Sequence, residues 1–157
     1  MIQYYYKTVR DEEFQLIPQV KEGCWIHVED ATTEDLATLS QLLGLDQADL
    51  QDCLDKFEVP RVERIQGTVL IFTRHPSEYE TGLYTSTLAI ILAPHYIATV
   101  SPHQCHLIQN FLQVLPHHCR QAPRPSPLVS GRGSGCCVVR LCGILWLKEE
   151  NDRVHIF

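Results

Sequence analysis

The chain has 157 residues, of which 45% are hydrophobic and 20% are charged, so it can bury a core and is not intrinsically disordered. Its net charge of -6 argues against a nucleic-acid-binding protein, which usually carries a basic surface. No run reaches the roughly 18 consecutive apolar residues of a membrane span, and residues 1–7 lack the apolar stretch of a signal peptide. The composition therefore predicts a cytoplasmic location, with no nucleic-acid partner and no membrane span in this chain.

Charge and cysteine are unevenly distributed along the chain. Residues 1–80 contain 16 Asp and Glu against 7 Lys and Arg, a net of -9, whereas residues 81–157 contain 3 acids against 6 bases, a net of +3. Four of the seven cysteines follow residue 118. An odd cysteine count without a signal peptide predicts reduced thiols, and the asymmetry indicates two segments under different constraints.

The first elements are two strands and a helix. Ile2–Lys7 is rich in β-formers, and the alternation in Cys24–Val28 predicts a short strand with both faces at least partly covered. Thr32 or Thr33 can cap the following helix, which Gly44 ends with a left-handed C′ residue. Its core-facing stripe is Leu36, Leu39 and Leu43.

A second helix is expected from Asp46, its N-cap, to the stop at Pro60. Four residues with helical spacing form the predicted apolar face of this helix: Leu50, Cys53, Leu54 and Phe57.

Two strand pairs and a third helix follow. Arg61–Ile65 and Thr68–Thr73 flank a turn at Gln66-Gly67, and Leu83–Leu92 pairs with Tyr96–Val100 around a turn forced by Pro94. Helical spacing then covers residues 107–115. The order of elements predicts an α/β domain, or an α+β mixed sheet, with helices on both faces. Five side chains are expected in the core: Trp25, Leu39, Leu54, Phe72 and Ile90.

The regular pattern stops at Pro116. Residues 116–135 contain four Pro, three Gly and three Arg, with no periodic apolar spacing. The sequence therefore predicts a domain over residues 1–115 and an irregular Pro/Gly/Arg/Cys-rich tail over residues 116–157.

The second helix contains the main candidate site. Asp49, Asp52 and Asp55 recur every three residues on one side of this helix. A hard divalent cation such as Mg²⁺ relieves the repulsion between such carboxylates. The alternative is a solvated acidic face. Because Mg²⁺ keeps much of its water shell, these residues would form only a partial divalent-cation site.

Histidine and cysteine provide a rival reading as a small soluble zinc-binding protein. His103, Cys105 and His106 precede a second group formed by His117, His118 and Cys119, and zinc accepts both ligand types. The spacing is not that of a zinc finger, and the alternative is surface histidines at helix ends. No nucleophile with an orienting partner and no phosphate-binding loop is present, so the chain is not expected to be an enzyme.

Several stretches, taken together, resemble the CorA-type magnesium channel family. Gly23–Val28 and Thr32–Leu36 resemble its "G-x-W-I-x-V … T-x-E-E-L" start, and Leu50–Asp55 with Pro60–Glu63 resembles its "L-x-D-x-L … P-R-[VI]-E" segment. Thr87–Leu92 with Tyr96–Val100 is similar to the "L-x-I-I-L … Y-[LI]-[IA]-T-V" hairpin of the family. The likeness extends from about Ile2 to about Leu115.

The resemblance implies a cytosolic domain of a homopentameric channel, in which carboxylates at subunit interfaces sense intracellular Mg²⁺ and bound metal favours the closed pore. Asp52 stands at the participating carboxylate position. The expected cofactor is weakly bound, regulatory Mg²⁺ or none, and the expected partners are copies of the chain or full-length channel subunits. An interaction module that regulates such a channel is a further alternative.

The channel family also has a stalk helix, two transmembrane helices and a Gly-Met-Asn motif, and the only methionine in this sequence is Met1. We therefore expect a truncated domain that cannot transport by itself. Since the family likeness and the regular spacing both stop near Leu115–Pro116, the hypothesis for the tail is a changed reading frame.

Overall fold

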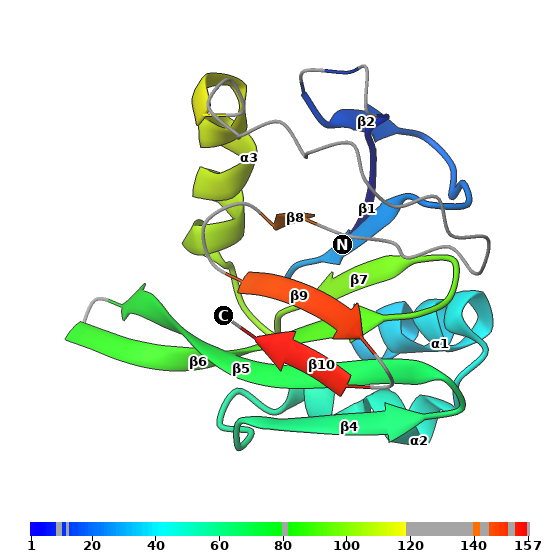
Figure 1. Ribbon diagram of the computed structural model, residues 1–157. Helices are drawn as coiled ribbons and strands as arrows, with labels where there is room; N and C mark the ends of the chain where they lie inside the picture. The colour runs from blue at the N-terminus through cyan, green and yellow to red at the C-terminus, as the bar shows by residue number, and fades with distance from the viewer. Residues whose placement is uncertain are drawn as a thin grey trace. The chain divides into compact units, whose positions relative to one another are not determined.

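A seven-stranded mixed sheet organises the computed structural model, which describes residues 1–8, 11, 13–79, 82–118, 140–141, 145–150 and 153–156 (Figure 1). The chain divides into two units, Met1–Leu112 and Gln113–Phe157. In chain order, the sheet of the first unit contains β1 (Ile2–Tyr6), β2 (Gln15–Ile17), β3 (Trp25–Val28), β4 (Arg61–Ile65), β5 (Thr68–Tyr79), β6 (Gly82–Leu92) and β7 (Ile97–Val100). The helical segments are α1 (Thr33–Leu43), α2 (Gln47–Leu50), the 3-10 helix η1 (Gln51–Leu54) and α3 (His106–His118).

The strand order is β2-β1-β3-β7-β6-β5-β4, and β3 and β7 form the parallel pair near the centre. Every residue of β3 is buried, as expected for a strand covered on both faces. Both predicted hairpins are confirmed, because β4 pairs antiparallel with β5 and β6 pairs antiparallel with β7. The fold is thus a mixed α/β sheet with helices, as the sequence predicts.

Helix α1 covers one face of the sheet. Thr32 forms a capping box with Asp35, and Gly44 ends the helix at φ 68°, a left-handed conformation that glycine adopts without strain. Leu36 and Leu39 are completely buried in a core cluster that includes Ile26 and Phe72. Burial of these apolar side chains stabilises the helix on the sheet.

The first turns of α3 pack on the opposite face, where the side chains of Trp25 and His27 lie. The Trp25 ring contacts Tyr5, Phe14 and Phe111, with 6.0 Å between the Trp25 and Phe111 ring centroids. The carboxylate of Glu29, just after β3, accepts hydrogen bonds from the Cys105 backbone N–H at 2.7 Å and from Gln109. Glu29 therefore caps the start of α3 from a distant part of the chain.

The predicted second helix is shorter than the sequence indicates. It continues only as far as Leu54, and its last turn is a 3-10 helix. Asp55 is extended, and its carboxylate accepts the Phe57 backbone N–H at 2.8 Å, a local hydrogen bond that competes with helix continuation. Phe57 is consequently 65% exposed rather than part of an apolar helix face.

Four of the five predicted core residues are confirmed as buried: Trp25, Leu39, Phe72 and Ile90. The prediction for Leu54 is wrong in degree, since its side chain is only partly buried at the edge of the core. Leu50 and Cys53 are completely buried and anchor this helical segment instead. Strand β2 was not predicted, because its three residues are too few for a periodic signal.

In the described part of the second unit, three short strands form an antiparallel sheet: β8 (Arg140–Leu141), β9 (Leu145–Glu150) and β10 (Arg153–Ile156). None of these strands was predicted, because the sequence pattern indicated an irregular tail. Residues 119–139 lie outside the described residues, and the changed reading frame stays a prediction. No helix within the described ranges combines the length and hydropathy needed to cross a bilayer.

Candidate functional site

The three candidate aspartates lie on the short helical segment after α1. Asp49 is in α2, Asp52 is in η1, and Asp55 is the residue at which η1 ends. The buried side chains of Leu50 and Cys53 fix this segment on the sheet, so the positions of the carboxylates are set by core packing. Burial raises the pKa of the Cys53 thiol to about 12, so this cysteine is a packed side chain and not a reactive one.

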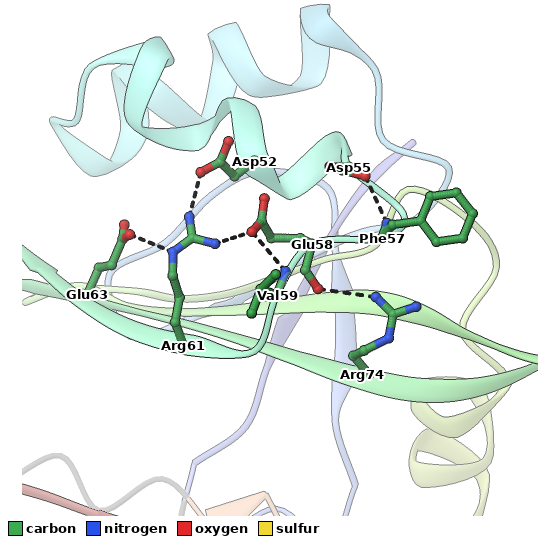
Figure 2. Close-up of polar contacts among 8 residues, drawn as sticks. All are labelled: Asp52, Asp55, Phe57, Glu58, Val59, Arg61, Glu63 and Arg74. Atoms are coloured by element: carbon green, nitrogen blue, oxygen red, sulfur yellow. Dashed lines mark hydrogen bonds and ion pairs between the residues drawn. The ribbon is translucent and has the colours of Figure 1, made fainter.

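Arg61, at the start of β4, is the centre of the polar contacts around Asp52 (Figure 2). Its guanidinium binds three carboxylates through three different nitrogens. Nη2 lies 2.5 Å from Asp52 Oδ2, Nε lies 2.6 Å from Glu63 Oε1, and Nη1 pairs with Glu58 Oε1. The guanidinium carbon also lies over the Phe72 ring, 4.2 Å from its centre, in a cation–π contact. Hydrogen bonding, first to Glu63 and then to Asp52, raises the pKa of Arg61, which stays charged.

Glu58 is the most firmly held of the three acids. Its side chain is 15% exposed, compared with 39% for Glu63 and 52% for Asp52. Its Oε1 also accepts the Val59 backbone N–H at 2.8 Å, and its backbone carbonyl accepts a hydrogen bond from Arg74. Among these acids, Asp52 is thus the one most open to a ligand from solution.

The structure does not bring the three candidate aspartates into one binding site. Asp52 is directed towards Arg61, and Asp55 is directed towards the Phe57 backbone. Among the residues that the structure describes, no group of three or more His, Cys, Asp or Glu side chains could hold a metal ion. Within one chain, the geometry provides one half-exposed carboxylate, that of Asp52, which is paired with Arg61. This carboxylate can fill at most one ligand position of a cation site shared between chains.

The roles of Arg61, Glu58 and Glu63 were not predicted from the sequence. The helical spacing of the aspartates does not reveal them, because Arg61 lies nine positions after Asp52 and returns to it only where β4 runs beside the helical segment. Arg61 and Glu63 do belong to the Pro60–Glu63 motif noted above. The motif alone does not indicate their partner.

The rival zinc ligands do not form a metal-holding group among the residues that the structure describes. Cys105 is completely buried, and its backbone N–H donates to Glu29. Burial raises the pKa of the Cys105 thiol, which disfavours the thiolate that zinc requires. The side chains of His117 and His118, together with Cys119, lie outside the described residues. A zinc centre is therefore not favoured.

Comparison with known proteins gives a consistent result. The family model described as "CorA-like Mg2+ transporter protein" matches residues 20–131. The cobalt/magnesium transport protein CorA of Methanocaldococcus jannaschii is 33% identical over 89 residues, which are 57% of this chain and 26% of that protein. The chain thus spans about a quarter of the length of this curated relative.

Solved structures agree on the fold. The soluble domain of the same Methanocaldococcus jannaschii protein superposes with a TM-score of 0.62 at 24% identity, covering 73% of this chain and 46% of that one. The cytoplasmic domain of ZntB from Vibrio parahaemolyticus has a TM-score of 0.55 at 12% identity, covering 74% and 49% respectively. At these identities the structures support the fold alone.

Proposed function

The chain belongs to the family of CorA-like Mg²⁺ transporter proteins, and we propose that it acts as the cytosolic regulatory domain of a divalent-cation transporter. The observation that carries this proposal is the family match over residues 20–131, which includes the segment from Asp52 to Glu63. The likeness of its fold to the soluble domain of a cobalt/magnesium transport protein supports it. The proposed location is the cytosolic side of the membrane.

Mg²⁺ is the proposed regulatory ligand, and Asp52 is the proposed ligating residue. Mg²⁺ prefers six oxygen ligands and gives up its water reluctantly. One carboxylate on a half-exposed side chain can therefore bind it only weakly. A tighter site needs oxygen atoms from a second chain. The proposed partners are accordingly copies of this chain or full-length channel subunits, with cation binding dependent on their assembly.

Thermal unfolding of the whole chain in rising Mg²⁺ tests the role of Asp52. A ligand that binds only the folded state raises the melting temperature. We expect a small rise at millimolar Mg²⁺ that Asp52→Asn abolishes. Asp30→Asn is the matched control, because Asp30 is exposed and has a φ of 49°, which asparagine tolerates. Equal stabilisation of the native chain and Asp52→Asn would refute the assignment of Asp52.

A further inference from the structure

Three buried polar side chains form a hydrogen-bonded chain on the sheet face against which α3 packs. Trp25 is 6% exposed, His27 is 2% exposed and Thr99 is completely buried. The Trp25 indole N–H donates to Thr99 Oγ1 at 2.9 Å, and His27 Nδ1 lies 2.9 Å from the same oxygen. Both contacts join β3 to β7, the parallel strand pair near the centre of the sheet. These groups satisfy one another in a place that water does not reach.

The donors and acceptors of this chain fix the protonation state of His27. An indole N–H can only donate, so Thr99 Oγ1 accepts from Trp25 and has its own hydrogen left to donate. His27 Nδ1 is the acceptor within reach, so the neutral ring carries its hydrogen on Nε2. A second proton on the ring turns Nδ1 into a donor. Thr99 Oγ1 then faces two donors, and its own hydrogen loses this acceptor inside the core.

The charges around His27 also favour the neutral ring. Burial lowers the pKa of His27 below its ordinary 6.5, and this effect outweighs the nearby Glu29 carboxylate and a backbone hydrogen bond to Thr99, which favour the charged ring. The α-ammonium group of Met1 acts in the same direction as burial. Strand β7 brings no ionisable side chain to this face, because its sequence is Ile-Ala-Thr-Val.

The Glu29 carboxylate also acts electrostatically on titratable groups of the neighbouring elements: Tyr5 of β1, His75 of β5 and Cys105 just before α3. Burial raises the pKa of Tyr5 and of Cys105, so both stay uncharged in mildly acidic solution. Burial lowers the pKa of His75, on which the exposed His106 of α3 also acts. His27 and His75 are therefore the buried groups that could gain charge here on acidification.

Helix α3 depends on the two residues that stand two positions before and after His27. The Trp25 ring meets the Phe111 ring edge-on at 6.0 Å, and the Glu29 carboxylate accepts the Cys105 backbone N–H at 2.7 Å. A positive charge on His27 attracts this carboxylate and so competes with the N-terminus of α3, which is the positive end of the helix. Helix α3 also joins the two units of the chain, because the boundary after Leu112 falls within it.

We propose that His27 is a pH switch that holds the first turns of α3 on the sheet when neutral and releases them when protonated. The released state exposes His27 to water and therefore takes up the proton more readily than the docked state. Docking of α3 is thus complete above about pH 6.5 and is lost as the pH falls below this value. Uptake of one proton changes the ratio of released to docked chains by about tenfold per pH unit at most. This switch does not depend on cation binding by Asp52.

Hydrogen exchange between about pH 8 and about pH 5, corrected for the intrinsic pH dependence of the exchange rate, tests the switch. The Gln109 amide, which donates to the Cys105 carbonyl, reports on α3. The Gly44 amide, which donates to the Ser40 carbonyl, reports on α1 at the opposite face. In the native chain, acid should reduce the protection of the Gln109 amide, by up to about tenfold per pH unit, and that of the Gly44 amide much less.

Two variants identify the group that titrates. His27→Asn keeps an acceptor at the δ position and cannot titrate, so the acid-dependent loss at Gln109 should disappear whatever the absolute stability of the variant. His95→Asn is the matched control, because the His95 side chain is 65% exposed, and this variant should behave like the native chain. Three results would overturn the proposal: no acid-dependent loss in the native chain, equal losses at Gln109 and Gly44, or a loss that survives in His27→Asn.

If His27→Asn does not fold, nitrogen NMR of the imidazole rings in the native chain answers the same question. His27 should carry its hydrogen on Nε2 at neutral pH, and protonation of its ring should coincide with the loss of protection at Gln109. A hydrogen on Nδ1 at neutral pH, or a ring that becomes charged without any change in exchange at Gln109, would overturn the proposal.

Discussion

Replacing Leu50 with alanine tests whether the segment that carries Asp52 is anchored by the core. Leu50 is completely buried among α1 and sheet side chains, whereas Leu54, one turn later, is only partly buried. Removing three carbon atoms from water-excluded packing costs about 0.8 kcal/mol for each. The cavity that remains brings the total to about 2–5 kcal/mol for a Leu→Ala change at a fully buried position.

Leu54→Ala is the matched comparison, since it removes the same atoms from the same segment. Part of the Leu54 side chain already contacts water, so this variant should lose distinctly less stability than Leu50→Ala. Urea unfolding of the whole chain, followed by far-UV circular dichroism, gives both free energies of unfolding. If Leu54→Ala costs as much as Leu50→Ala, or if Leu50→Ala costs nothing, the helical segment is not anchored as described.

Three further effects can be measured independently. Glu29→Ala should destabilise the chain by about 1–3 kcal/mol and speed hydrogen exchange at the Cys105 amide, because the N-terminus of α3 loses its hydrogen-bond acceptor. Glu29→Gln keeps one side-chain oxygen and should lose less stability. Equal losses of stability in the two variants would contradict the capping role of Glu29. Cys53 should resist labelling by iodoacetamide at pH 9 in the folded chain and should react in urea, as read by peptide mass spectrometry. Labelling of the folded chain at the rate of a free thiol would contradict the burial of Cys53. Burial raises the pKa of Cys53 from its ordinary 9.0 to about 12 in the folded chain. The contribution of this thiol to stability is therefore complete below pH 9 and is lost as the pH rises towards 12. In urea unfolding, Cys53→Ala should accordingly lose less stability at alkaline pH than the native chain does.

The elements with strong local signals were predictable from the sequence. Thr32, the leucine spacing and Gly44 define α1 through capping and periodicity, and the structure reproduces each feature. Strand β3 was also predictable, because apolar residues on both sides of Cys24–Val28 fit only a strand covered on both faces. These features depend on neighbours within a few residues, so a sequence pattern records them directly.

The features that depend on distant contacts were not predictable in this way. The end of η1 depends on the hydrogen bond that the Asp55 carboxylate accepts from the Phe57 backbone N–H. The surroundings of Asp52 depend on β4, which begins nine residues later at Arg61. Glu29 caps α3 across 76 positions of sequence. The aspartate spacing correctly drew attention to Asp52, but its electrostatic partner follows from sheet topology and not from helical periodicity.

The regulatory role of Asp52 is tested most directly in a transporting chimera. In this chimera, residues 1–112 of the chain replace the matching segment of the Methanocaldococcus jannaschii transport protein, and cation flux is measured in liposomes against Mg²⁺ on the cytosolic side. We expect cation flux to fall as the Mg²⁺ concentration rises. Asp52→Asn, but not Asp30→Asn, should raise the Mg²⁺ concentration required to reduce the flux. The regulatory role of Asp52 would be contradicted by a conducting chimera whose flux does not change with Mg²⁺, or whose response to Mg²⁺ is the same with Asp52→Asn.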